Sequence, residues 1–412
     1  MMKFLFSGLL LFSLMSLSAQ NRMDEVNFKF SGFIRGDLVY NTRESVTALE
    51  DLFYLYPKDR LYDEAGKDLN AQMSSGFYTI ATRVALDVSG IKYGNSEVSG
   101  KIEADFAAAG GTAAMLRLRL AYLKMDWSKA SLWIGQNWHP LFQTIQPDQL
   151  TLATGAPFQP FNRSPQIRYD YRINSFTLKA AAVYQLQNKS TGPEGKSNIY
   201  QKNAVLPELN GIIEYKKTSI CTGIGIIFLP LKPRRQSFVE NKRYKVDERV
   251  RSLSYTAYFQ YTEGLFKWGL KSMYGQNNSG LNMLGGYGIK ASDSVTGERK
   301  YTNFNYSASW MNVSYGNKYK ANLMLGYTKN LGTDDNLLEN SELYGEGLDV
   351  DNMYRIGAAF SYNIPHLSSG LEYEFISANY GNKDSFDWNK GQYNSTHEIK
   401  DHRITVVIRY IF

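Results

Sequence analysis

The sequence predicts an all-β fold, in which sixteen antiparallel strands close into a transmembrane barrel. Three observations favour it: an exported chain without a helical span, strands whose two faces differ in polarity, and an aromatic-rich composition. In the last ten residues, apolar side chains occupy every second position from Ile404 to Phe412, and the other face carries Arg403 and Arg409. The chain has 30 Tyr, 22 Phe and 6 Trp, yet its mean hydropathy is −0.37. An apolar outer band with aromatic girdles around a polar lumen accounts for that combination.

Residues 1–19 are predicted to be a secretory signal peptide, which leaves residues 20–412 as the barrel. Lys3 precedes an apolar run from Leu9 to Leu14, and Leu17-Ser18-Ala19 offers a small-residue cleavage site. No later run of eighteen or more apolar residues occurs, which excludes a helical membrane protein. Exported chains that finish on a strand with a terminal aromatic resemble outer-membrane barrels. We therefore expect the chain in the outer membrane of a Gram-negative bacterium, in contact with its lipid.

Segments long enough to cross a membrane recur along the whole chain, since about nine to eleven tilted residues suffice for a spanning strand. The predicted strands cover residues 28–40, 77–88, 96–106, 114–126, 130–138, 166–173, 175–186, 207–216, 218–229, 251–262, 264–275, 302–314, 318–330, 352–363, 366–379 and 400–412. The spacers alternate short and long, as expected for tight periplasmic turns and long external loops. Residues 281–290 could form another strand, but an odd count would separate the termini, so we assign them to the sixth external loop.

The third external loop, residues 139–165, contains five of the eleven prolines. Proline cannot donate to a strand ladder, so this segment does not span. It is either a surface loop with proline turns or a segment folded into the lumen. We favour the second, because a barrel of this size otherwise leaves a wide aqueous channel.

One stretch of the chain, about residues 131–172, resembles the DcaP-like outer-membrane porins. The matching residues are Gly135-Gln136-Asn137-Trp138, Pro157-Phe158 and Arg163-Ser164-Pro165-Gln166-Ile167-Arg168-Tyr169. The resemblance implies a trimeric sixteen-stranded channel for small anionic solutes such as dicarboxylates, with the third loop forming a constriction in the lumen. The long first loop (residues 41–76) and the short lead before the first strand differ from that pattern.

Charged residues on the predicted lumen face suggest how such a channel would select. Several arginines come from the second, fourth and sixth strands, on one side of the barrel, and the third loop contains a single acid. The candidate pore-lining residues are Arg35, Arg83, Arg117, Arg119, Arg163, Arg168, Arg172 and Asp148. A guanidinium stays charged and binds a carboxylate with two hydrogen bonds. For each arginine, an alternative stays open: it could simply pair with a wall acid such as Glu103, Asp105 or Asp170.

Most aromatic residues, including Phe304, Tyr306 and Trp310, are expected on the lipid-facing surface or in the interfacial girdles. Few are predicted in the lumen, which argues against an aromatic slide for sugars. The four histidines are His139, His366, His397 and His402, and no pair has convincing metal spacing. We expect no enzyme activity, no metal and no cofactor, and the scattered basic residues do not favour nucleic-acid binding.

Two functional classes remain. The first is a porin for passive diffusion of small hydrophilic solutes, preferring anions such as carboxylates, and assembled as a homotrimer. The alternative is a barrel that serves mainly as a structural or surface-interaction protein and conducts little.

Overall fold

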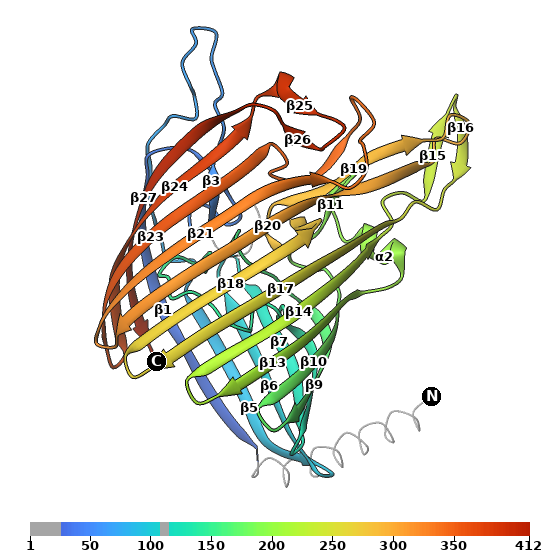
Figure 1. Ribbon diagram of the computed structural model, residues 1–412. Coiled ribbons are helices and arrows are strands. Elements are labelled where there is room, and N and C mark those ends of the chain that lie inside the picture. Colours follow the sequence, from blue (N-terminus) through green and yellow to red (C-terminus); the bar gives the residue numbers. More distant parts are fainter. Residues whose placement is uncertain (1–25, 108–114) are drawn as a thin grey trace, which may run out of the picture.

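The computed structural model describes residues 26–107 and 115–412. The predicted signal peptide and most of the second external loop, expected at 107–113, lie outside the described residues. Within those ranges, sixteen strand positions close into an antiparallel barrel (Figure 1). They are β1 (Asn27–Asn41), β4 (Ser74–Tyr78) with β5 (Arg83–Tyr93), β6 (Ser96–Asp105), β7 (Arg117–Asp126), β8 (Ala130–Trp138), β9 (Arg163–Ile173), β10 (Phe176–Val183), β13 (Glu208–Lys217), β14 (Ile220–Leu231), β17 (Val250–Glu263), β18 (Phe266–Gln276), β20 (Arg299–Gly316), β21 (Tyr319–Thr333), β23 (Val350–Ile364), β24 (Leu367–Gly381) and β27 (Thr396–Ile411).

The barrel closes between its first and last strands, because β1 pairs with β27 on one side and with β4 and β5 on the other. At this seam the C-terminal Phe412 contacts two residues of β1. The Phe412 N–H donates to the Gly32 carbonyl (3.1 Å), and its ring stacks on Phe30 at 5.8 Å between centroids. The sixteen-stranded architecture is therefore confirmed, and both ends of the barrel sheet are paired.

Shorter elements lie in the loops. They are β2 (Ser45–Thr47), β3 (Tyr54–Pro57), β11 (Thr191–Gly192), β12 (Gly195–Lys196), α2 (Ile199–Ala204), β15 (Gln236–Val239), β16 (Lys242–Lys245), η1 (Asn278–Leu281), β19 (Gly285–Ser292), β22 (Leu343–Glu346), η2 (Lys383–Ser385), β25 (Phe386–Asp387) and β26 (Gln392–Tyr393). The ambiguous segment 281–290 includes much of β19, which pairs with β20 and β22. It forms a strand, and it lies in the sixth external loop as assigned.

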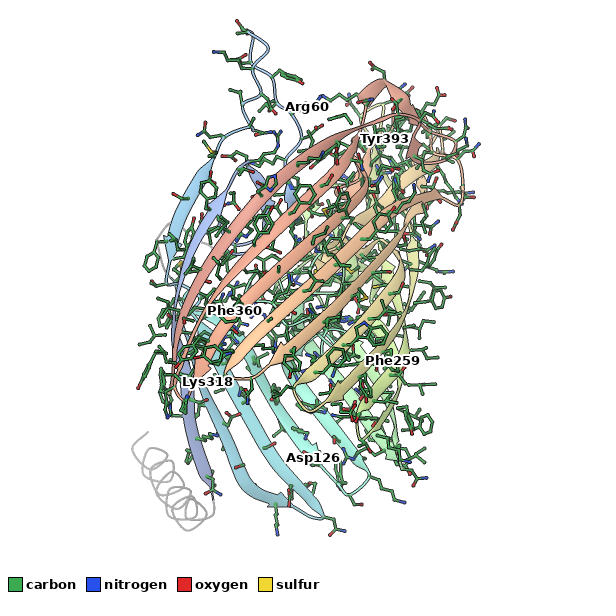
Figure 2. The ribbon with its side chains drawn as sticks, turned by 60° about the vertical axis from the view of Figure 1, so that its left-hand side comes forward. Arg60, Asp126, Phe259, Lys318, Phe360 and Tyr393 are labelled. Atoms are coloured by element: carbon green, nitrogen blue, oxygen red, sulfur yellow. The ribbon has the colours of Figure 1, made fainter. Side chains whose placement is uncertain are left out.

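The outer wall carries an apolar belt. Phe28, Phe30 and Ile408 are more than half exposed, while the alternate side chains Arg35, Asp37 and Arg403 of β1 and β27 are buried inside. Such a belt is the surface that a barrel of this kind presents to outer-membrane lipid. Figure 2 shows Arg60 and Tyr393 beyond one rim and Asp126 at the opposite end, by the short turns. No helix among the described residues is both long and apolar enough to cross a membrane.

The segment between β8 and β9, residues 139–162 (loop 3), is folded into the lumen as predicted. Its apolar side chains Leu141, Phe142, Ile145 and Phe158 belong to one buried cluster with residues of the barrel wall. Burying this apolar surface against the wall is favourable in the way that a soluble core is. Around these side chains the lumen on that side is therefore packed.

Polar anchors from the wall also hold loop 3. Lys271 of β18 donates to the Leu141 carbonyl and to the hydroxyl of Thr144. Three further wall residues bond to the loop. Trp310 Nε1 donates to the Gln159 side chain (3.1 Å), and Arg355 donates to the Ala156 carbonyl (3.2 Å). Glu372 accepts a hydrogen bond from the Leu150 N–H. Because a buried peptide group without a partner is costly, these anchors fix the course of the loop.

The first loop, assigned to the external side, also sends part of its chain into the lumen. The ring of Tyr54 in β3 is fully buried, and the guanidinium carbons of Arg355 and Arg403 each lie 5.3 Å from its centroid. Arg403 also donates to the Asp51 carbonyl. Only the distal part, which includes Arg60, extends beyond the rim (Figure 2).

The lipid-facing placement of three aromatic residues on β20 is wrong. Phe304, Tyr306 and Trp310 are at most 2% exposed and belong to the cluster that contains loop 3. Ser307 and Ser309 occupy the alternate positions, which face outward. Since loop 3 covers the inner face here, that face is more apolar than the outer one, and the usual alternation misleads.

We expect that replacing Lys271 with Met loosens loop 3, because two backbone or hydroxyl acceptors lose their buried donor. Each unsatisfied group costs about 1–3 kcal/mol. Single-channel recordings should give a larger and noisier current than the unaltered protein. Lys329→Met, on the outer face of β21, is the control and should change neither property. Should the folded Lys271 variant conduct like this control, the lysine does not hold the loop. Trp310→Phe removes only the bond to Gln159 and should change the current in the same direction, but less.

Candidate functional site

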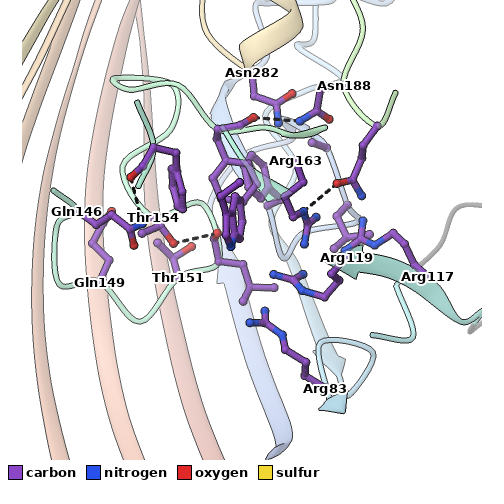
Figure 3. A pocket seen from close by; sticks show the side chains of 18 of the residues that line it. Arg83, Arg117, Arg119, Gln146, Gln149, Thr151, Thr154, Arg163, Asn188 and Asn282 are labelled. Atoms are coloured by element: carbon purple, nitrogen blue, oxygen red, sulfur yellow. Dashed lines mark hydrogen bonds between the residues drawn. The ribbon is translucent and has the colours of Figure 1, made fainter. Parts of the chain in front are cut away.

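A cavity of about 350 Å³ lies between loop 3 and the half of the wall built from β1, β5, β7 and β9 (Figure 3). Among its described lining residues are six arginines and no aspartate or glutamate. The arginines are Arg35, Arg83, Arg117, Arg119, Arg163 and Arg409. The side chains of Arg83, Arg117, Arg119 and Arg163 converge in the close view of Figure 3. Five of the eight predicted pore-lining residues thus share one cavity.

Strand register explains why three of these arginines stand together. Asp105 of β6 lies directly opposite Arg83 on β5 and Arg117 on β7. Its carboxylate lies 2.7 Å from Arg117 and 2.6 Å from Arg119. Glu103, two residues back on the same face, lies 2.7 Å from Arg119 and 3.4 Å from Arg83. Two carboxylates therefore hold three guanidinium groups at the cavity wall.

The other three arginines differ in their pairing. Arg35 lies 2.6 Å from Asp37 and also donates to the Leu150 carbonyl of loop 3. Arg163 donates to the side chain of Gln187 (2.8 Å), and neither it nor Arg409 has a carboxylate partner among the described residues. Six arginines and three carboxylates (Asp37, Glu103 and Asp105) leave this cluster with a formal charge of +3.

Aromatic rings support the arginines on the cavity wall. Arg163 and Arg119 lie over Trp138, at 4.8 and 5.7 Å from the ring centroid. Arg83 and Arg409 lie over Phe33, at 5.0 and 5.6 Å. A cation over a ring face is attracted by the ring quadrupole without losing its charge. The rings therefore position the guanidinium groups while leaving their N–H donors available.

The structure places the remaining three predicted residues elsewhere. Arg168 pairs with Asp170 at 2.6 Å and also binds Gln143, outside the cavity lining. Arg172 donates to the Trp127 carbonyl at a short turn. Asp148 lies on loop 3, but it faces a second cavity of about 310 Å³. There it lies 3.1 Å from Lys267 and 2.9 Å from Lys320.

Arg409 is the one arginine lining the described cavity that the predicted site omitted. Alternation along the last strand assigns it to the lumen, but its relation to the other arginines depends on closure of the barrel. In the closed barrel, Arg409 lies directly opposite Arg35. These two positions are 374 residues apart in the sequence. Pairing the first predicted strand with the last would have placed Arg409 beside Arg35 and so added it to the predicted site.

His139, the first residue of loop 3, is fully buried, and its Nε2 lies 2.7 Å from a carboxylate oxygen of Glu208. It fixes the start of the loop to β13. The described residues contain no group of three or more His, Cys, Asp or Glu side chains arranged to hold a metal ion.

Comparison with known proteins gives structural matches only. No family model and no curated protein matches the chain. The outer-membrane channel DcaP of Acinetobacter baumannii superposes with a TM-score of 0.67 at 18% identity, over 94% of this chain and 98% of that one. The trimer form of OmpT of Vibrio cholerae gives 0.55 at 12% identity, over 94% and 99%. The anion-selective porin of Comamonas acidovorans gives 0.53 at 10% identity, over 94% and 100%. The fold implied by the DcaP-like resemblance is thus confirmed: the chain has the sixteen-stranded fold of outer-membrane porins.

Proposed function

We propose that this barrel is a porin for passive diffusion of small hydrophilic solutes, and that it prefers anions such as carboxylates. The observation that carries the proposal is the cavity beside loop 3, lined by six arginines and by no carboxylate side chain among the described residues. Arg35, Arg83, Arg117, Arg119, Arg163 and Arg409 form its selective part. No catalytic role is proposed.

The electrostatics of the cavity support this preference. A pore selects by the field at its narrow part, where low-dielectric walls strengthen each charge. The three carboxylates of the cluster point at arginines, so they offset part of the charge while orienting the guanidinium groups. A net charge of +3 remains facing the cavity, and paired N–H donors match the geometry of a solute carboxylate.

The solved structures with this fold are consistent with the proposal. One of them is described as an anion-selective porin and another as a trimer. We propose that this chain likewise assembles as a homotrimer in outer-membrane lipid.

A barrel with little conductance is the second candidate, favoured by how much of the lumen is filled. Besides loops 1 and 3, Leu281, Met283 and Leu284 of the sixth loop are buried in the same cluster. The N–H of Phe161 in loop 3 donates to the Leu281 carbonyl (2.8 Å). Current through the folded protein distinguishes the two candidates.

In a planar bilayer across a KCl gradient, the purified mature protein should give a reversal potential of the sign that indicates chloride preference, because the cluster attracts anions. The potential should approach zero as salt rises, since screening shortens the range of the field. Cation preference would contradict the arginine site, and a folded barrel without current would favour the second candidate.

Replacing both Arg163 and Arg409 with Gln should lower the anion-to-cation permeability ratio several-fold, because the cluster falls from +3 to +1. Neither residue has a carboxylate partner to leave unpaired in the described part of the chain, so the wall should keep its fold. Arg172→Gln, outside the cavity lining and without an ion pair among the described residues, is the control and should retain the original ratio.

The Arg117→Ala/Arg119→Ala variant also removes two charges, but it exposes the paired acids Glu103 and Asp105. It should weaken anion preference at least as much as the Gln pair. An unchanged permeability ratio in both double variants would remove these four residues from the selective site.

A further inference from the structure

A shallow apolar groove lies on the outer wall, across β10, β13, β14, β17 and β18. Two adjoining hollows of about 810 and 480 Å³ share Ile213, Ile224, Ala257 and Ser272 among their lining residues. Gly211, Ala257 and Ser272 are small, whereas the larger neighbours Ile224 and Tyr255 stand out from the wall at 59% and 49% exposure. The groove therefore arises where small outward residues on adjacent strands fall between large ones.

Two outward hydroxyls in this part of the wall bond to each other. The hydroxyls of Ser272 and Ser309 lie 2.8 Å apart across β18 and β20. The groove thus presents apolar side chains and mutually bonded hydroxyls, which suits a hydrocarbon chain rather than a polar ligand.

The fifth external loop, which joins the two central strands of the groove, is strongly basic. Residues 232–251 contain eight Lys and Arg and three Asp and Glu, and they include the β15–β16 hairpin that extends beyond the rim in Figure 1. Asp247 pairs with Lys232 and Arg249, and Glu248 with Arg234. Five other cations have no ion pair among the described residues: Arg235, Lys242, Arg243, Lys245 and Arg251.

The groove leads to one of these cations, Arg251. Arg251 and Ala257 share the outward face of β17, with Leu253 and Tyr255 between them. Six residues of strand span about 20 Å. On the hairpin, Phe238 is 59% exposed, and the guanidinium carbon of Arg243 lies 5.1 Å from its centroid. An exposed aromatic beside cations is typical of a membrane interface.

We propose that this face binds a phosphorylated, acylated lipid of the outer leaflet. An acyl chain lies in the groove over Gly211 and Ala257, and phosphate groups contact Arg251 and the hairpin residues Lys242, Arg243 and Lys245. Charge complementarity selects this occupant, because a neutral lipid would leave the unpaired cations without a counter-ion. The site lies outside the lumen and does not depend on what the channel conducts.

The test uses the purified full barrel in detergent, incubated with diphosphorylated lipid A, and native mass spectrometry to count bound lipid. Ala257→Phe fills the groove from its outward face, and Ala358→Phe on the outward face of β23 is the matched control. Lys242→Gln/Arg243→Gln/Lys245→Gln removes the hairpin cations. Arg60→Gln/Lys67→Gln, on the exposed part of loop 1, is its control.

We expect several-fold less bound lipid for the Ala257 variant and for the hairpin variant, and no loss for either control. With dephosphorylated lipid A, the hairpin variant should match the unaltered protein, whereas Ala257→Phe should still bind less. Equal lipid binding by all variants would overturn the proposal. So would an Ala257→Phe protein that changes its subunit number but not its bound lipid, because the groove would then be an interface between copies. Conductance and ion preference, measured on the same variants, should not change, so this outcome is independent of the proposed function.

Discussion

The attachment of loop 3 to one half of the barrel wall is the constraint on which the rest of this structure depends. Lys271, Trp310, Arg355 and Glu372 hold the loop against β18 to β24. Around the loop, that half of the lumen becomes a packed and largely apolar interior, and the arginine-lined cavity lies on the other side, along β1, β5, β7 and β9. The arginines of the opposite wall face this remaining space, so the course of the loop sets where their charge is exposed.

The sequence predicts the wall much better than it predicts the interior. All sixteen spanning positions follow from alternation, because lipid contacts the outer face around the whole barrel and demands apolar residues there. The inner face has no such uniform neighbour. Where loop 3 covers it, Tyr306 and Trp310 are buried and serines face outward, so the same rule inverts. The inward course of loop 1 gave no local signal either, since its anchors Arg355 and Arg403 are about 300 residues or more away.

The candidate site was predictable to the extent that it follows the alternation of side chains between the two faces of a strand. This alternation places Arg83, Arg117 and Arg119 on the inner face, and neighbouring strands bring them together. It says nothing about height along the barrel, so it did not separate them from Arg168 and Arg172, which lie outside the cavity. The sequence left open that these arginines only pair with acids of the wall. Glu103 and Asp105 do pair with them, yet these acids are too few to neutralise the cluster. Burying charges in a wall requires such partners, and an incomplete set leaves a field.

The anchors of loop 3 also have a consequence for how the chain is assembled. The loop precedes its partners on β18, β20, β23 and β24 by 127 to 222 residues in the chain. Without the strands of β18 to β24, loop 3 would therefore lack these wall partners. Its position in the lumen is a property of the closed barrel, and no segment near the loop in sequence could supply the same contacts.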